Sequence, residues 1–336
     1  MDYSIKDLKS YIHGLYWFGK EDFELNRFPS SAFPRLSKDV AFLSTNPAGV
    51  RIRFRAKTSG IGVELEMRPT QKYDHFSRAG QCGLDLYIDN KYHHTYVPPR
   101  DEYFLSWMEV DGSREHEYMI YLPTYASLHL ISVGVDNTIL AAKPYAIKKP
   151  IVFYGSSITQ GAYASRPGLA YPSIIERALD ADIINLGFSG NGKGEPEVAD
   201  LVSRIDASCF VMDWGGNLTS PPEAGLFEQR YRPFLKMVKE RHPDTPILCN
   251  SLQWIDPPQA DSHFQTRCEK IRSETRAVYE EEIKKGNQRI AFIDGKKIIG
   301  PDDKDCTADG THANDLGFHR YVEVILPVLK SLLGVS

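Results

Sequence analysis

The sequence predicts an all-β domain followed by an α/β domain built on a parallel sheet. Its 336 residues are about twice the roughly 150 of an average domain. Short runs of alternating apolar and polar residues dominate the chain as far as Lys148. From residue 149 onward, four-residue apolar runs alternate with helical patterns. We therefore expect an N-terminal accessory domain at 1–148 and a second domain at 149–336, with residues 148–150 as a short linker.

The first half reads as a series of short strands with one apolar face. Residues 50–55 alternate strictly between apolar side chains and arginines, and residues 61–67 alternate with glycine and glutamate. The Ser59-Gly60 pair between these two runs predicts a hairpin. Similar patterns lie at 84–89, 117–122 and 128–133. Several short strands of this kind predict an antiparallel sandwich or jelly roll.

The second half alternates between short buried strands and helices. The predicted strands are residues 151–154, 183–186, 209–212, 246–249 and 290–293. The predicted helices are residues 171–179, 197–205, 226–241, 261–285 and 316–333. Strands that are apolar on both faces and separated by helices predict a parallel sheet that is covered on both sides. Sites in such sheets form at the carboxyl ends of the strands.

Composition excludes several classes of protein. The formal net charge is −4, which gives no support to nucleic-acid binding. No apolar run approaches the 18 residues of a membrane span. The five cysteines are widely spaced and fit buried thiols better than a disulfide framework or a zinc site. The N-terminal residues do not resemble a signal peptide, so we expect a cytoplasmic protein, or a periplasmic or secreted one if a leader has been removed.

Polar and glycine-rich loops follow the predicted strands and carry the candidate chemistry. A serine at a tight strand-to-helix turn presents its hydroxyl, but it needs a base to become a good nucleophile. Ser157 is the candidate nucleophile, His312 its base, and Asp309 the carboxylate that fixes the tautomer of the histidine. The Gly190 N–H and the Asn217 amide are candidate donors to a developing oxyanion. Together these residues predict an acyl-transfer site.

Each of these residues also has a plainer interpretation. On this interpretation, Gly190 is present for its backbone freedom in a loop, and Asn217 caps the following helix. The Asp309/His312 pair is then a turn or a fragment of a metal site. A rival motif, Gly187-x-x-x-x-Gly192-Lys193, resembles a phosphate-binding loop, but Gly194 stands where the motif needs serine or threonine.

Four sequence blocks in order resemble the SGNH/GDSL hydrolase superfamily. They are Gly-x-Ser-Ile-Thr-Gln-Gly around Ser157, then Gly190, then Gly-Gly-Asn ending at Asn217, then Asp-Gly-Thr-His ending at His312. The resemblance implies a flavodoxin-like three-layer α/β/α domain and ester hydrolysis without a cofactor or metal. It implies Ser157, Asp309 and His312 as the triad, with the Ser157 N–H, Gly190 and Asn217 as the oxyanion hole. The general motif has aspartate before the nucleophile, where this chain has Ser156.

The first half narrows the resemblance. The residues Gly83-Leu84-Asp85-Leu86-Tyr87 are similar to the Gly-x-Asp-Leu-Tyr signature of a β-sandwich domain that precedes one SGNH subgroup. The stretch Ala-Ser-Arg-Pro-Gly at 164–168 also resembles that subgroup. Its members are mostly described as esterases or acetylhydrolases, often linked to carbohydrates.

These observations give the expectations for function. We expect a serine esterase that hydrolyses small acyl esters, acetyl foremost, of a small molecule or oligosaccharide. The open alternatives are an acyltransferase and a glycan-binding protein with a vestigial esterase domain. Trp214, Trp254 and Arg166 are candidate pocket residues, although the tryptophans also fit core packing and Arg166 a surface ion pair. Nucleic acid and membrane are not expected as partners, and a homo-oligomer remains open.

Overall fold

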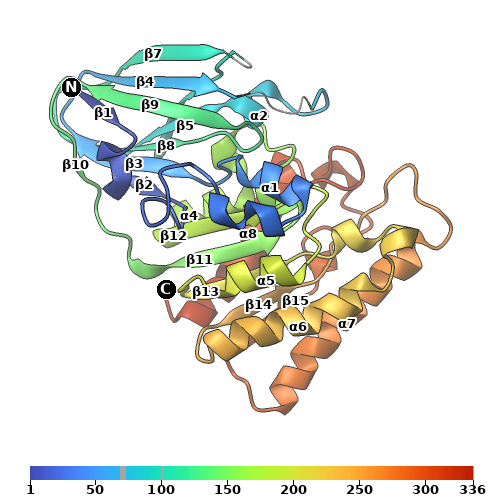
Figure 1. The fold of residues 1–336 in the computed structure, drawn as a ribbon. Helices are drawn as coiled ribbons and strands as arrows, with labels where there is room; N and C mark the ends of the chain where they lie inside the picture. The colour runs from blue at the N-terminus through green and yellow to red at the C-terminus, as the bar shows by residue number, and fades with distance from the viewer. Residues whose placement is uncertain (69–72, 100–101, 336) are drawn as a thin grey trace. The chain divides into compact units, whose positions relative to one another are not determined.

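The computed structural model describes residues 1–68, 73–99 and 102–335 of the chain (Figure 1). The described chain separates into two compact units. The N-terminal unit consists of Met1–Tyr145 and a short segment from later in the chain, Ser165–Gly168. The C-terminal unit consists of Ala146–Ala164 and the chain from Leu169 onward. No helix of the described residues is both long and apolar enough to cross a membrane.

Two antiparallel sheets form the N-terminal unit, as the sequence predicts. One has the strand order β1-β9-β4-β7, and the other has the order β10-β3-β8-β5-β6 with β2 paired to β3. Their apolar faces share a core that includes Ile52, Val63 and Ile120. The elements are β1 (Asp2–Ser4), β2 (Ile12–His13), α1 (Lys38–Ser44), β3 (Arg51–Ala56), β4 (Gly60–Met67), α2 (Arg78–Cys82), β5 (Leu84–Ile88), β6 (Lys91–Tyr96), β7 (Tyr103–Glu109), β8 (His116–Tyr121), β9 (Leu128–Val135) and β10 (Leu140–Ala141).

The predicted hairpin at Ser59-Gly60 is wrong. Strand β3 pairs with β8, whereas β4 pairs with β7 and β9 in the other sheet. The chain therefore changes sheets at this corner. Asp136 holds the corner, because its carboxylate accepts the Ser59 N–H at 2.8 Å and the Ser59 hydroxyl at 2.5 Å.

The C-terminal unit contains the predicted parallel sheet. Its strand order is β12-β11-β13-β14-β15, and every pair is parallel. This order is that of a flavodoxin-like fold, which confirms the predicted fold class. The strands are β11 (Ile147–Gly155), β12 (Ala181–Gly187), β13 (Cys209–Asp213), β14 (Ile247–Asn250) and β15 (Ile290–Ile293).

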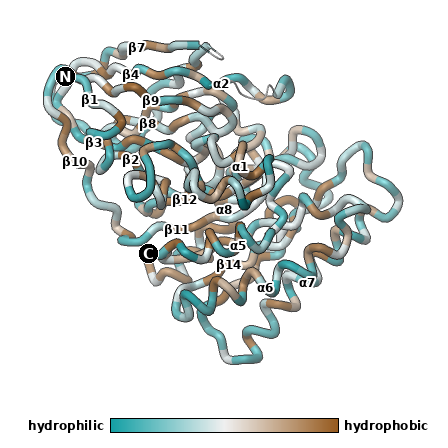
Figure 2. The backbone as a smooth tube through the Cα atoms, viewed as in Figure 1, coloured by the Kyte–Doolittle hydropathy of each residue, from teal (hydrophilic) through white to brown (hydrophobic). Residues whose placement is uncertain are grey.

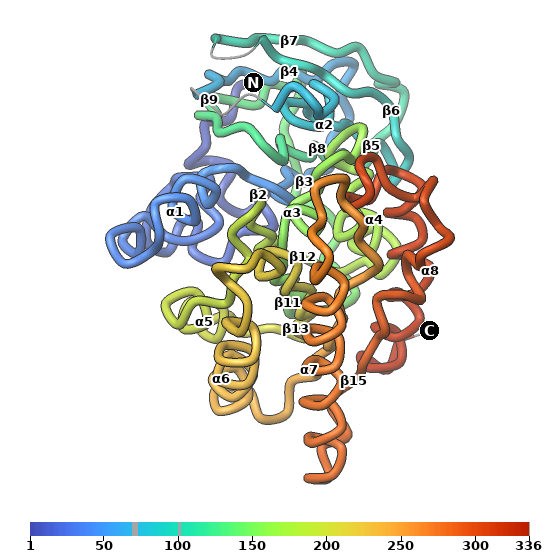
Figure 3. Tube along the Cα trace, turned by 90° about the vertical axis from the view of Figure 1, so that its right-hand side faces the viewer, coloured from blue at the N-terminus to red at the C-terminus, as the bar shows by residue number. Residues whose placement is uncertain are grey.

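Helices cover both faces of this sheet (Figure 3). Helices α4 and α8 share a core with one face, where Phe153, Val211 and Phe318 are fully buried. Helices α5, α6 and α7 cover the other face, where Tyr154 contacts Phe234 at a ring distance of 4.8 Å. The helices are α3 (Ser157–Gln160), α4 (Tyr171–Leu179), α5 (Pro196–Ser203), α6 (Leu226–Arg241), α7 (Phe264–Lys284) and α8 (Asp315–Leu333). Figure 2 shows α7 as mainly hydrophilic with hydrophobic patches, as expected of a helix with one exposed face.

The predicted linker at 148–150 is also wrong, because these residues lie inside β11. The pairing of β11 with β12 shifts register between Ile147 and Ile151. Pro150 has no N–H for the sheet, but its carbonyl accepts the Ser208 N–H at 2.8 Å. Lysine and proline are common both in irregular edges of strands and in linkers, so the sequence alone does not distinguish a bulged strand from a linker here.

Candidate active site

Ser157 lies at the carboxyl end of β11, on the first turn of α3. The strand ends at Gly155, and Ser156 then caps α3, its hydroxyl accepting the Ile158 N–H at 3.4 Å. Ser156 therefore supplies a hydrogen bond to the loop at the position where the general motif has aspartate. The side chain of Ser157 is buried, with 5% of its surface exposed.

His312 and Asp309 come from the loop between a short 3₁₀ helix (Lys304–Cys306) and α8. The Nε2 atom of His312 lies 2.9 Å from the Ser157 Oγ atom. The Nδ1 atom lies 2.8 Å from Asp309 Oδ2. The other carboxylate oxygen of Asp309 accepts the backbone N–H groups of His312 at 2.8 Å and Thr311 at 3.0 Å. The three side chains thus form one continuous line of hydrogen bonds, in the order that the sequence predicts.

These contacts determine the charge of Asp309. Partial burial by itself raises the pKa of the carboxyl group. The hydrogen bonds from the ring and backbone of His312, the charge of His312 and the Thr311 N–H outweigh burial and hold the pKa of Asp309 well below its usual range. Asp309 is therefore ionised at neutral pH. An ionised Asp309 accepts the Nδ1–H, which leaves Nε2 of His312 as the acceptor for the serine hydroxyl.

Gly190 and Asn217 lie in the loops that follow β12 and β13. Gly190 is exposed and has a φ of +68°, which explains the glycine. The Ser189 N–H ties this loop to α3 by donating to Gln160 Oε1 at 2.9 Å. Asn217 does not cap α6, because the residue before that helix is Gly225.

Gly192 is a further residue of the site that the predicted set lacks. A Cβ atom on Gly192 would lie 2.3 Å from the Gly155 carbonyl oxygen and 3.2 Å from the Ser156 Cα, so only glycine fits against the turn. Its N–H donates to Asn217 Oδ1 at 3.0 Å. This bond fixes the Asn217 amide and leaves its NH₂ group as the donor. The spacing Gly190-x-Gly192 is the signal in the sequence that could have found it.

A buried carboxylate lies beneath the serine turn. Asp213 ends β13, and its carboxylate accepts hydrogen bonds from Tyr171 at 2.7 Å, Thr159 at 3.1 Å and Asn250 at 2.7 Å. Burial raises the pKa of Asp213, and these three bonds act in the opposite direction. Thr159 belongs to α3, so Asp213 ties the helix that carries Ser157 to the sheet.

Trp254 borders a cavity of about 340 Å³ next to Asp309. The cavity is also lined by Asp256, Asp303 and Lys304. Trp254 is half-buried, and its backbone N–H donates to the Ile299 carbonyl at 2.9 Å. The structure thus places this candidate pocket residue and Asp309 on the same cavity.

Trp214, in contrast, is a core residue and not a pocket residue. Only 3% of its surface is exposed, and its ring packs on Phe227 at 5.0 Å and Tyr231 at 5.5 Å. It also lies against Gly194, where a Cβ atom would approach the ring to 2.1 Å. An aromatic residue that follows a strand looks the same in sequence whether it faces a cavity or the core.

Arg166 forms an ion pair with a buried carboxylate. Arg166 belongs to the N-terminal unit, where its guanidinium group donates to Asp85 at 2.8 Å and to the Tyr87 hydroxyl at 2.7 Å. Asp85 is fully buried and also accepts the Gly168 N–H at 2.7 Å. The Asp and Tyr of the Gly-x-Asp-Leu-Tyr signature therefore bind the Ser165–Gly168 segment.

Lys193, the key residue of the phosphate-loop alternative, forms an ion pair with Glu223. The Lys193 carbonyl accepts a hydrogen bond from Arg230 at 2.9 Å. The lysine is thus engaged by the start of α6 and its preceding turn.

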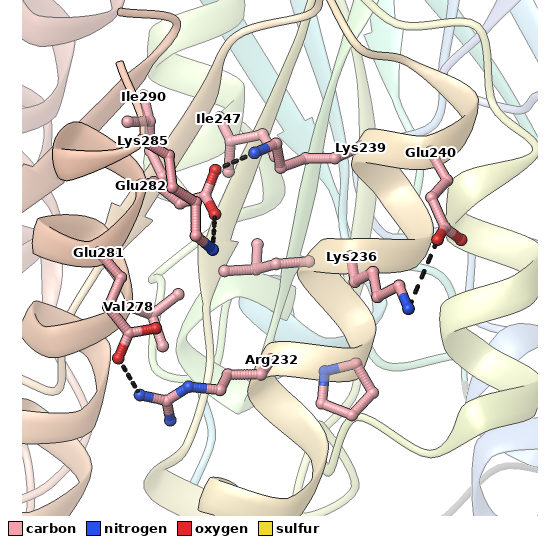
Figure 4. A pocket seen from close by; sticks show the side chains of 12 residues that line it. Arg232, Lys236, Lys239, Glu240, Ile247, Val278, Glu281, Glu282, Lys285 and Ile290 are labelled. Carbon is pink, nitrogen blue, oxygen red and sulfur yellow. Dashed lines mark hydrogen bonds and ion pairs between the residues drawn. The ribbon is translucent and has the colours of Figure 1, made fainter. Parts of the chain in front are cut away.

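A larger cavity, of about 710 Å³, lies between α6 and α7 at the amino end of the sheet. Ile247 and Ile290, the first residues of β14 and β15, line it. Figure 4 shows charged side chains of both helices bridging it. Glu281 pairs with Arg232 at 2.7 Å, and Glu282 pairs with Lys239 and Lys285.

A flavodoxin-like sheet with a serine, a histidine and an aspartate at its carboxyl edge is typical of SGNH-type hydrolases. Residues 148–330 match the model of the GDSL-like lipase/acylhydrolase family, and residues 3–139 match the N-terminus of SGNH-hydrolase-type esterases. The chain belongs to the GDSL-like lipase/acylhydrolase family. Comparison with curated proteins finds no significant match.

Solved structures resemble the chain over nearly its whole length. A protein of Bacteroides ovatus classed as a GDSL-like lipase is 30% identical, with a TM-score of 0.87 over 100% of this chain and 98% of that one. A salicylyl-acyltransferase from a tetracycline biosynthetic pathway is 20% identical, with a TM-score of 0.84 over 99% and 97%. A family two carbohydrate esterase from Clostridium thermocellum, in complex with cellohexaose, is 15% identical, with a TM-score of 0.64 over 92% and 98%. The last two show likeness of fold alone.

Proposed function

We propose that the protein is a serine esterase that removes small acyl groups, acetyl foremost, from carbohydrates. The observation that carries the proposal is the unbroken line from Ser157 Oγ to His312 at 2.9 Å and from His312 to Asp309 at 2.8 Å. Membership of a lipase/acylhydrolase family agrees with it.

The geometry suits a two-step acyl transfer. His312 takes the proton of the Ser157 hydroxyl at Nε2, while Asp309 holds the ring in the required tautomer. The serine oxygen attacks the ester carbonyl, and the negative charge that develops on the carbonyl oxygen needs fixed donors. The donors we assign are the N–H groups of Ser157 and Gly190 and the Asn217 amide. His312 then protonates the leaving alcohol, and water repeats the sequence on the acyl-enzyme.

The choice of a carbohydrate rests on the cavity beside Asp309. An indole ring offers an apolar face for a sugar ring, and Asp256, Asp303 and Lys304 offer partners for hydroxyl groups. The fold is shared with a carbohydrate esterase that was solved with cellohexaose. We expect acetylated mono- or oligosaccharides to be better substrates than long-chain esters.

The test is the loss of covalent labelling and of turnover in Ser157→Ala. We expect this variant to release no p-nitrophenol from p-nitrophenyl acetate above background and to take up no fluorophosphonate. The matched control is Ser156→Ala, which removes the neighbouring hydroxyl and keeps the nucleophile, so labelling persists. Turnover by Ser157→Ala at the wild-type rate would exclude Ser157 as the nucleophile.

An acyltransferase is the second candidate, because the salicylyl-acyltransferase shares the fold over almost the whole of both chains. The two functions differ only in the acceptor that reaches the acyl-enzyme. Product analysis with a sugar alcohol competing against water distinguishes them: an acylated acceptor as the main product favours the transferase. A glycan-binding protein with a vestigial site would show no labelling at all.

A further inference from the structure

Tyr163 is held in an unusual backbone conformation beside the triad candidates. It lies between α3 and α4 with a φ of +62°. The other non-glycine residues with positive φ in the described chain are Asp89, Asn90 and Asp180. Aspartate and asparagine tolerate this region, whereas a bulky aromatic residue does so only under constraint from its surroundings. The contacts of Tyr163 should therefore account for the strain.

Those contacts are with the histidine and the aspartate of the proposed triad. The Tyr163 ring contacts the His312 ring in a tilted arrangement, with centroids 5.4 Å apart and planes inclined by 32°. Its hydroxyl group hydrogen-bonds to Asp309. Burial, and then the charge and hydrogen bond of Asp309, raise the pKa of Tyr163 to about 12, so the phenol stays protonated and acts as a donor.

The Asp309 carboxylate is held mainly by groups of its own loop. The two N–H groups bonded to Asp309 Oδ1 belong to Thr311 and His312, which are neighbours in the same turn. The side chains remain partly exposed, at 35% for Asp309 and 24% for His312. Tyr163 contacts both residues from a different segment, the one that follows the helix of Ser157.

We infer that Tyr163 is a positioning residue, which fixes the His312 ring by its tilted ring contact and the Asp309 carboxylate by a hydrogen bond. The inference rests on the proposed function. A backbone strained at a site where it aligns functional groups is a common arrangement in enzymes. Because Tyr163 acts through His312 and Asp309, it should affect the rate of serine activation and not the binding of the ester.

The test compares Tyr163→Phe with Tyr163→Gly. The first variant keeps the ring and removes the hydroxyl, and we expect kcat to fall about three- to tenfold with KM unchanged. The second also removes the ring while relieving the backbone, so we expect a larger fall in kcat without a matching fall in Tm. The control is Asp180→Gly, which relieves a positive φ at the end of α4 and should leave kcat unchanged.

The rate of fluorophosphonate labelling at Ser157 distinguishes a failure of the positioning role of Tyr163 from a failure of the proposed esterase function. Labelling needs an activated serine and is independent of the natural ester. We expect the labelling rate of Tyr163→Phe to fall in proportion to kcat. Equal labelling and equal kcat in wild type and Tyr163→Phe would overturn the positioning role alone, as would a raised KM with kcat unchanged. Absence of labelling in the wild type would overturn the proposed function and this inference with it.

Discussion

The two ends of the parallel sheet contrast in how they hold their polar groups. At the carboxyl end, Ser157 of α3 is joined to His312 and Asp309 of the loop before α8 by hydrogen bonds of 2.8–2.9 Å. At the amino end, long charged side chains of α6 and α7 bridge a cavity of about 710 Å³ (Figure 4). The cavity at the carboxyl end is about half as large, at about 340 Å³. The larger of the two cavities therefore lies at the end of the sheet opposite to Ser157.

The difference lies in the precision of the contacts. At the carboxyl end, backbone N–H groups fix the side chains: Gly192 holds Asn217, and Thr311 helps to hold Asp309. Directional bonds from the backbone leave each functional group one orientation, which catalysis requires. At the amino end, the ion pairs join long charged side chains of α6 and α7, and partly exposed pairs of this kind stabilise weakly. Changes at the two ends should accordingly affect different measurements.

The largest expected effect in this comparison is that of Asn217→Ala. It removes the amide that Gly192 orients, and loss of one oxyanion donor lowers kcat by about 10²–10³-fold. KM should change little, because the donor acts mainly on the transition state. Steady-state kinetics with p-nitrophenyl acetate measure this. Asn287→Ala, which removes an amide from Glu282 at the other end of the sheet, is the control. A fall in kcat of less than tenfold would show that Asn217 is not an oxyanion donor.

For thermal stability, in contrast to kcat, we expect a small effect of Asp309→Asn that depends on pH. The pKa of Asp309 is lowered in the folded protein, so its carboxylate contributes stability above its ordinary pKa of 3.8, and this contribution is lost as the pH falls below that value. We expect the wild type to exceed the variant in Tm by about 3 °C at pH 7, a difference that shrinks below pH 4. Thermal unfolding followed by circular dichroism from pH 3 to 7 measures it.

The control for this pH series is Asp302→Asn, an exposed carboxylate in the chain leading to the same loop. Its Tm difference from the wild type should stay small throughout. A difference between wild type and Asp309→Asn that stays constant from pH 7 to pH 3 would show that the Asp309 carboxylate does not stabilise the folded protein through its lowered pKa.

The smallest effect is expected at the amino end. Glu282→Gln leaves Lys239 and Lys285 without their carboxylate and should lower Tm by about 2 °C while kcat stays within twofold of the wild type. Glu240→Gln, whose exposed partner Lys236 lies at 3.7 Å, is the matched control and should change neither quantity. A large fall in kcat for Glu282→Gln would mean that the two ends are coupled.

The sequence predicts the C-terminal unit well because its signals are local. Residues 171–179, 226–241 and 290–293 are helices and a strand with the predicted bounds. The N-terminal sheets are harder to predict, because alternation fixes which side of a strand is buried but not which strand it pairs with. Strand β7 is absent from the predicted strands. Tyr103, Leu105 and Trp107 are apolar but more than half exposed, so β7 shows no contrast between its faces.

In the candidate site, too, local motifs were predictable and contacts between distant segments were not. The motifs identify Ser157, Asp309 and His312, and the structure brings these three residues together, although their catalytic roles stay predictions. Tyr163 could not be found this way, because its position depends on a left-handed backbone and on a partner about 150 residues away in the chain. The residues that contact Trp214 and Arg166, namely Phe227 and Asp85, could not be predicted either, because they lie outside any local pattern.

The binding of Ser165–Gly168 by Asp85 bears on how the protein can be divided. The N-terminal unit is discontinuous in the chain, since this segment belongs to it by its contacts although it follows Ser157 in sequence. A shortened chain that begins at residue 149 would carry Arg166 and Gly168 without the carboxylate that accepts their hydrogen bonds. A chain that ends at 148 would leave Asp85 buried without its arginine. The two signatures, Gly-x-Asp-Leu-Tyr and Ser-Arg-Pro-Gly, therefore belong to one compact unit, although Asp85 and Arg166 are 81 residues apart in the chain.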